Sequence, residues 1–174
     1  MPHDDPLQPS RVLLQPVRRA DAAELIAANR ENVDYHAPWA KTFTDQAGFD
    51  GWFARTITGA NVSLVAREAA SDALVGVVNL NEIVMNVLRG TYVGYWGYAA
   101  TAGRGLMTDA LRAAVRYAFD ELGLHRVEAN VQPGNSRSIA LVRRVGFMRE
   151  GLSPRYLFLD GAWRDHERWA LLAD

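Results

Sequence analysis

The chain has 174 residues, of which 49% are hydrophobic and 22% charged, a composition typical of one globular domain with its own core. Its 19 basic and 20 acidic side chains give a formal net charge of -1, so no global field attracts nucleic acid or an anionic membrane. Cysteine is absent, which excludes disulfides, thiolate zinc sites and a cysteine nucleophile.

The first ten residues, MPHDDPLQPS, are polar and contain proline. They have neither the basic start nor the apolar stretch of a signal peptide, and no apolar run approaches the roughly 20 residues that span a bilayer. We therefore expect residues 1–10 to be a flexible tail and residues 11–174 to form one domain. The protein is expected to be cytoplasmic, without membrane contact.

The first part of the domain reads as a strand followed by helices. Residues 12–17 are apolar enough for a strand, and Asp21 is a suitable N-cap for the helix that starts AAELIAANR. Residues 32–44 show no clear period and predict a loop with aromatic anchors. A second helix is predicted from the apolar spacing within residues 49–57.

Three consecutive runs rich in β-branched and aromatic residues, 62–67, 74–84 and 91–98, predict an antiparallel meander. Residues 105–122 form the clearest amphipathic helix, and Gly123 is its natural stop.

The remaining chain predicts a strand at 127–131, a short helix at 136–145 and a hairpin of 147–159 with 163–172. We find no repeat or linker, and expect one α/β domain with a mixed sheet.

A glycine loop joins the predicted strand at 91–98 to the long helix. Without Cβ atoms at Gly103 and Gly105, main-chain N–H groups can approach a ligand closely, and the helix start favours a di-anion such as pyrophosphate. The alternative is a tight turn that binds nothing. A dinucleotide fingerprint needs a glycine where Thr108 stands, and no Gly-Lys-Ser/Thr sequence of a Walker loop occurs.

Four segments, VGYW, AGRGLMTDAL, HRVEANVQPGNSRS and RRVGF, resemble the GNAT superfamily of acyl-CoA N-acyltransferases. The run from Leu124 onward, with RYLFLDGAWRDH, is similar to the RimJ/RimL-type ribosomal-protein N-terminal acetyltransferases. The resemblance begins near Arg11, is strongest after Gly94 and is weak over the first 90 residues. It implies a mixed, mostly antiparallel sheet, splayed between its central strands and flanked by helices, with acetyl-CoA in the cleft and no metal.

The resemblance also assigns the cofactor site. Pantetheine would pair with the strand edge at residues 95–98, and pyrophosphate would lie on the loop at 100–105, where Ala100 replaces the usual Gln or Arg. Expected cofactor-binding residues are Trp96, Gly97, Tyr98, Thr101, Ala102, Gly103, Arg104, Gly105, Asn135 and Arg137. Arg143 and Arg144 are assigned to a solvated helix face.

For catalysis, the family's Asn-x-x-Ser pattern falls on Asn135 and Ser138, so that Ser138 would protonate the departing thiolate. The alternative is a helix-start serine bonded to the main chain. A main-chain N–H near Trp96 or Gly97 would polarise the thioester carbonyl. Glu82 is the nearest carboxylate for a general base, and the alternative is a solvated residue at a strand end.

The acceptor site falls in the least recognisable part of the chain. Tyr35, His36 and Trp39 could wall it, with Tyr156 from the hairpin, although aromatic side chains in such segments more often pack on the core. The four histidines show no metal-ligand spacing.

These features predict an acetyl-CoA-dependent N-acetyltransferase that acts by direct transfer, with a protein N-terminus as acceptor. The alternatives are a small amine, such as an antibiotic or a polyamine, as acceptor, or a non-catalytic acyl-CoA-binding module. The sequence leaves the oligomeric state open, a homodimer included.

Overall fold

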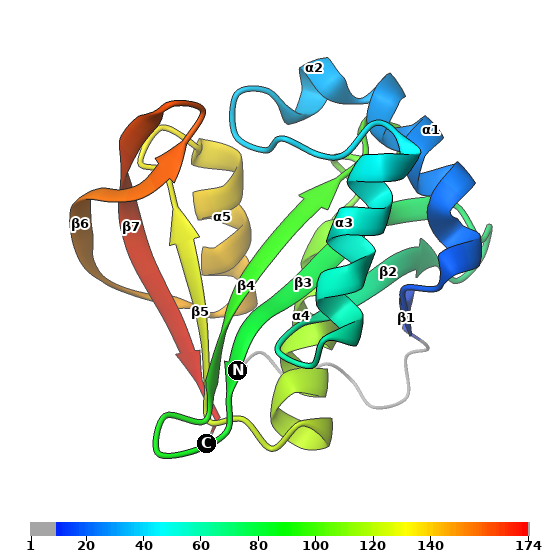
Figure 1. Ribbon diagram of the computed structural model, residues 1–174. Coiled ribbons are helices and arrows are strands. Elements are labelled where there is room, and N and C mark those ends of the chain that lie inside the picture. Colours follow the sequence, from blue (N-terminus) through cyan, green and yellow to red (C-terminus); the bar gives the residue numbers. More distant parts are fainter. Residues whose placement is uncertain (1–9, 174) are drawn as a thin grey trace.

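Seven strands form one sheet in the spatial order β1-β2-β3-β4-β5-β7-β6 (Figure 1). The computed structural model describes residues 10–173, so the tail expected at residues 1–10 lies, apart from Ser10, outside the described residues. The strands are β1 (Val12–Pro16), β2 (Val62–Glu68), β3 (Leu74–Val84), β4 (Gly90–Gly97), β5 (Arg126–Val131), β6 (Met148–Leu159) and β7 (Ala162–Leu172). The predicted strands are thus all present.

The centre of the sheet is splayed. β4 and β5 are the parallel pair, whereas the other neighbouring strands are antiparallel. Pairing of β4 with β5 is limited to Gly90–Tyr92 against Arg126–Glu128, and beyond it the two strands diverge (Figure 1). This confirms the mixed, mostly antiparallel and splayed sheet expected from the sequence.

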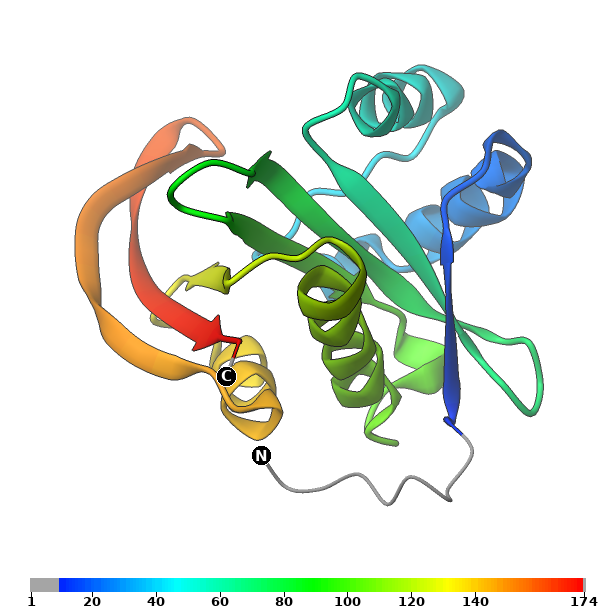
Figure 2. The same cartoon turned by 90° about the horizontal axis from the view of Figure 1, so that it is seen from below.

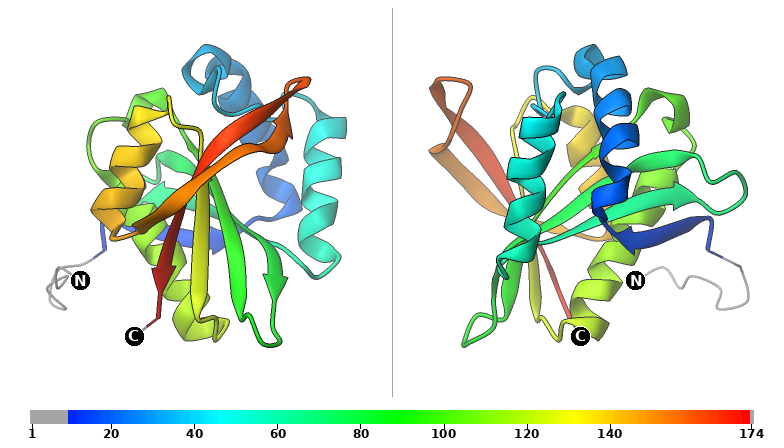
Figure 3. Two further views of the ribbon diagram at one scale, coloured as in Figure 1. Left: turned by 90° about the vertical axis from the view of Figure 1, so that its left-hand side faces the viewer. Right: turned by 45° about the vertical axis from the view of Figure 1, so that its right-hand side comes forward.

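Helices cover both faces of the sheet (Figure 2). On one face lie α1 (Ala22–Glu31), α2 (Val33–His36) and α3 (Gln46–Ile57), and on the other lie α4 (Leu106–Arg116) and α5 (Ser136–Val145). Figure 3 shows α1 and α3 beside each other, and the β6–β7 hairpin curving away from the other strands. Because each helix buries one apolar face on the sheet, the core divides into two main layers, one under α4 and α5 and one under α1 and α3.

Three local details differ from the sequence expectations. The short helix α2 lies within the segment predicted as a loop. Asp21 does not cap α1 with its side chain, because its carboxylate accepts the N–H of Arg18 at 2.7 Å instead. The long helix ends in a π-helical turn at Tyr117–Glu121, and Gly123 then adopts a left-handed conformation (φ +64°).

None of the helices in the described residues has both the length and the apolarity needed to cross a membrane.

Candidate active site

The splay leaves the edge of β4 without a partner strand. The N–H of Tyr98 donates to the carbonyl of Val75 on β3 at 3.2 Å. Main-chain groups of successive residues in a strand point to opposite sides, so those of Tyr95 and Gly97 face the gap toward β5 and those of Trp96 face β3. Of the two residues considered for polarising the thioester, only Gly97 therefore turns its main-chain N–H to the gap.

His36 ties the segment after α1 to this edge. Its Nε2 lies 2.8 Å from the carbonyl oxygen of Gly97, and its Nδ1 lies 3.2 Å from the hydroxyl of Thr42. A carbonyl oxygen only accepts, so Nε2 carries the proton. Burial lowers the pKa of His36, which keeps the ring neutral. His36 thus has a positioning role at the end of β4.

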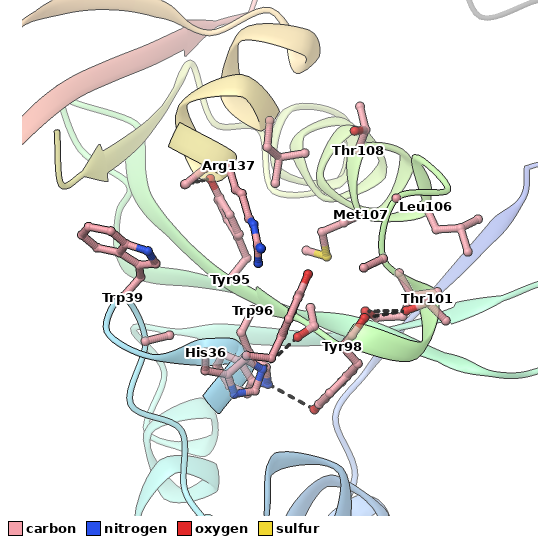
Figure 4. Close-up of a pocket in the computed structure, with 18 of the residues that line it drawn as sticks. His36, Trp39, Tyr95, Trp96, Tyr98, Thr101, Leu106, Met107, Thr108 and Arg137 are labelled. Atoms are coloured by element: carbon pink, nitrogen blue, oxygen red, sulfur yellow. Dashed lines mark hydrogen bonds between the residues drawn. The ribbon is translucent and has the colours of Figure 1, made fainter. Parts of the chain in front are cut away.

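A cavity of about 690 Å³ extends from the gap along β4, α4 and α5. Figure 4 shows Tyr95, Trp96 and Tyr98 along β4, with Met107 of α4 and Arg137 of α5 pointing into the cavity. Of the predicted cofactor residues, Trp96, Gly97, Tyr98, Thr101, Ala102, Gly103, Gly105, Asn135 and Arg137 all line it. Tyr35, His36 and Trp39, expected at the acceptor, also line this cavity.

The far end of this cavity is a cluster of main-chain donors. Gly103 and Gly105 have φ of +75° and +78°, the left-handed conformation that glycine adopts most easily. The N–H groups of Thr101 and Ala102 are already used in a turn. Within the described residues no hydrogen bond is made by the N–H groups of residues 103–107, so the free donors begin in the second half of the loop at 100–105 and continue into α4. Together with the start of α4 they suit a pyrophosphate.

Two arginines, Arg137 and Arg144, line this cavity. The guanidinium of Arg137 lies 5.4 Å from the ring centre of Tyr35, and Arg144 Nη1 lies 3.4 Å from the hydroxyl of Thr108. Arg104 instead forms an ion pair with Glu68 and does not line the cavity. The structure therefore argues against Arg104, and for Arg144, as a cofactor contact.

A second cavity of about 190 Å³ opens on the other side of the gap. β4, β5 and the β6–β7 hairpin contribute to its walls, and the two cavities share Trp39, Tyr95, Asn135 and Ser138. A donor bound in the larger cavity and an acceptor bound in the smaller one can therefore meet at these four residues.

At this meeting point the hydroxyl of Ser138 lies 2.5 Å from the hydroxyl of Tyr95. The N-cap of α5 is Asn135, whose side-chain oxygen accepts the N–H of Ser138 at 3.1 Å. The side chain of Ser138 is thus bonded to Tyr95 and not to the main chain, unlike a capping serine. Burial raises the pKa of Tyr95 to about 12, so the phenol is neutral near pH 7.

Glu82 and Tyr156 are not brought to either cavity. Glu82 is exposed and has a φ of +51°, at the point where the β3–β4 register shifts. Glu82 thus lines neither cavity, and its role as the base stays a prediction. The hydroxyl of Tyr92 donates a hydrogen bond to Tyr156, which raises the pKa of Tyr92, and the Tyr156 ring centre lies 6.2 Å from that of His166.

Among the polar and ionisable side chains at the cavities, sequence reasoning missed those of Tyr95, Arg144, Asn130 and His166. A signal for Asn130 was present, because the apolar alternation of Val127, Ala129 and Val131 puts Asn130 on the opposite face of β5. Nothing in the sequence pointed to His166, whose position depends on how β7 aligns with β5.

The family model described as "Acetyltransferase (GNAT) domain" matches residues 11–148. The chain belongs to the GNAT acetyltransferase family. Over 95% of its length it is 32% identical to the "Probable N-acetyltransferase YjcK" of Bacillus subtilis (96% of that protein). Over the same share it is 32% identical to the "[Ribosomal protein uS5]-alanine N-acetyltransferase" of Escherichia coli (89% of that protein).

A solved structure, "Mycobacterium smegmatis RimJ in complex with CoA-disulfide", superposes with a TM-score of 0.82 at 32% identity, covering 93% of this chain and 82% of that one. The present protein, as a GNAT acetyltransferase, uses acetyl-CoA as donor. The features of its larger cavity fit that molecule: free main-chain donors and two arginines at one end, an open strand edge along the middle and Ser138 at the gap.

Proposed function

We propose that this acetyltransferase transfers the acetyl group directly, within a ternary complex, to the N-terminal α-amino group of a protein. The observation that carries the proposal is the meeting of the two cavities at Tyr95 and Ser138. Donor and acceptor can approach from the two cavities, and no covalent acetyl-enzyme is required. The alanine N-acetyltransferase named for ribosomal protein uS5 is consistent with such an acceptor.

The residues that line the two cavities favour a protein N-terminus over a polycationic small molecule as the acceptor. No Asp or Glu lines either cavity within the described residues, whereas a polyamine or an aminoglycoside needs carboxylates to offset its several charges. The smaller cavity, at about 190 Å³, is below the 300–1,000 Å³ of typical small-molecule sites, and suits the end of a chain. Exposed apolar side chains on the adjoining hairpin offer contact for following residues: Leu157, Phe158, Leu159 and Trp163.

Each step of the transfer has a candidate group. The main-chain N–H of Gly97 would polarise the thioester carbonyl, since it faces the gap. Ser138 would protonate the sulfur as the carbon–sulfur bond breaks, and Tyr95 would hold its hydroxyl in place. If the acceptor is a ribosomal protein, as in the Escherichia coli relative, the enzyme would act in the cytoplasm.

The test is thiol release from acetyl-CoA with three acceptors side by side: peptides that begin with Ala or Ser, spermidine and an aminoglycoside. We expect the peptides to react and the same peptides, blocked at the α-amino group but containing lysine, to be inert. Faster turnover of spermidine or the aminoglycoside than of any free peptide contradicts the proposal.

A further inference from the structure

Two hydrogen-bond acceptors on the wall of the smaller cavity have unused capacity. Within the described residues, the side-chain oxygen of Asn130 is buried and has no hydrogen-bond partner. His166, only 2% exposed, has a hydrogen bond at one ring nitrogen and none at the other. Both residues line the cavity. Leaving a buried acceptor unpaired is costly, so the free ring nitrogen of His166 suits a ligand that brings an N–H group.

The tautomer of His166 follows from its one hydrogen bond. Its Nδ1 lies 3.0 Å from the main-chain carbonyl oxygen of Arg164, which can only accept. Nδ1 therefore carries the proton of the neutral ring, and the lone pair is on Nε2. In the described residues, Asn130 Oδ1 is the one side-chain nitrogen or oxygen that is both fully enclosed and unpaired. Nε2 of His166 is also unpaired, so it is not fully enclosed.

Strand register brings the two side chains to the same face. Asn130 of β5 pairs with Arg168 of β7, and His166 lies two residues from Arg168. Residues i and i+2 of a strand share a face, so Asn130, Arg168 and His166 face away from the core residues Ala129 and Val131.

The titratable surroundings of His166 are few. From β6, the ring of Tyr156 is 6.2 Å away, and from β4, Tyr95 lines the same cavity. On β7 itself, Arg164 and Arg168 occupy the same face of the strand. Among the described residues that line the smaller cavity, His166 is the one with an imidazole, and none has a carboxylate or an amine.

We propose that His166 is the general base of this acetyltransferase, with Nε2 removing a proton from the acceptor's ammonium group. The proposal rests on the proposed function in one respect, since it puts the acceptor amine in the smaller cavity. It assigns a catalytic role to a residue that the sequence motifs leave aside.

Acetyl transfer to a protonated amine releases one proton. His166 takes one proton from the ammonium group and passes it to water. The lone pair of the neutral amine forms the carbon–nitrogen bond, and the carbon–sulfur bond then breaks. Ser138 gives its proton to the sulfur and regains one from the acetylated nitrogen, so a single proton is released per turnover.

The kinetic test compares His166→Gln with His125→Gln, the same substitution at an exposed histidine that lines neither cavity. With the acceptor that the wild type turns over best, kcat/KM of His166→Gln should fall about 10²-fold near pH 6.5, where the amine is protonated. The deficit should shrink to below about tenfold near pH 9, because an α-amino group with a pKa of about 7.7–8.0 is then largely neutral. Affinity for acetyl-CoA and the melting temperature should match those of His125→Gln.

A rate deficit that is equal at both pH values, or no deficit, contradicts the proposal. A third variant, Glu82→Gln, tests the competing carboxylate. If kcat/KM at low pH falls in Glu82→Gln and not in His166→Gln, the base is Glu82. Failure of peptides as substrates in the wild type would count against the proposed acceptor alone, since any amine that is acetylated supports the comparison.

A second measurement needs no turnover. Nitrogen-15 NMR of the histidine rings, assigned with His166→Gln, should show Nε2 of His166 unprotonated near pH 8, and this signal should shift when a peptide with a free N-terminus is added. A proton on Nε2 at that pH, or no shift with a peptide that the enzyme acetylates, overturns the assignment.

Discussion

The hydroxyl of Ser138 lies 2.5 Å from the phenol of Tyr95, and this contact joins the start of α5 to the exposed edge of β4. Both side chains line both cavities. Under the proposed function, this pair lies where the sulfur of the donor and the amine of the acceptor would meet.

We expect Ser138→Ala to lower kcat by about 10²-fold, the lower end for loss of a general acid, because a thiolate can also leave unaided. Affinity for acetyl-CoA should be kept. The melting temperature should also be kept, since Asn135 and not Ser138 caps α5. Ser136→Ala, an exposed position on the same helix, is the control. Wild-type kcat in folded Ser138→Ala would show that the acid lies elsewhere.

Tyr95→Phe keeps the ring and removes the hydroxyl that holds Ser138. We expect kcat to fall by about tenfold, less than in Ser138→Ala. Since the pKa of Tyr95 is raised to about 12, the phenol does not titrate between about pH 6 and 9, and the shape of the pH profile should not change. The double variant should be no slower than Ser138→Ala. Additive losses would show that Tyr95 acts independently.

Much of the fold was predictable because local patterns determine it. Apolar alternation identified the strands, and the helical period with a terminal glycine identified the helix that begins after Gly105. Gly103 and Gly105 were correctly singled out, because their left-handed conformations are a local need of the loop. Long-range pairing also followed from the family resemblance, which implied the splay.

The parts of the site that sequence reasoning missed depend on contacts between distant segments. Arg104 is held by Glu68, 36 residues earlier in the chain, and Arg144 reaches the cavity from α5. Glu82 itself adopts a left-handed conformation inside β3, which a glutamate rarely does, so its position could not be read from the strand pattern. His166 lies at the smaller cavity only because β7 pairs with β5 in one register.

The glycine loop gives a prediction about donor binding. Gly103→Val should weaken acetyl-CoA binding by at least about tenfold, because an L side chain at φ +75° costs roughly 1–2 kcal/mol and displaces the N–H groups. Gly161→Val is the matched control, with φ +74° in the hairpin turn. Calorimetric titration should show weaker binding in the first variant only. Equal affinities in the two folded variants would remove the loop from the binding site.

The arginines give a second binding prediction. Arg144→Ala should weaken acetyl-CoA by about tenfold, a loss of about 1.4 kcal/mol, with a smaller loss at high salt. Arg104→Ala should bind normally, because its guanidinium is paired with Glu68 outside the cavity. Arg143→Ala controls for charge on α5, since Arg143 packs over the ring of Trp169. A larger loss of acetyl-CoA affinity in Arg104→Ala than in Arg144→Ala would support Arg104 as the cofactor contact, as predicted from the sequence.

The last prediction concerns His36 and the stability of the fold. Burial lowers the pKa of His36 from its ordinary value of 6.5, so between the two values the unfolded chain binds more protons than the folded one. The stabilisation is therefore complete above pH 6.5 and is lost as the pH falls through the folded pKa. His36→Gln can still donate to the carbonyl of Gly97 but cannot titrate. Its melting temperature should consequently fall less between about pH 7 and 5 than that of the wild type, while His125→Gln should follow the wild type. Parallel curves for His36→Gln and the wild type would mean that His36 is not buried in its neutral form, and that the hydrogen bond to Gly97 does not hold the end of β4.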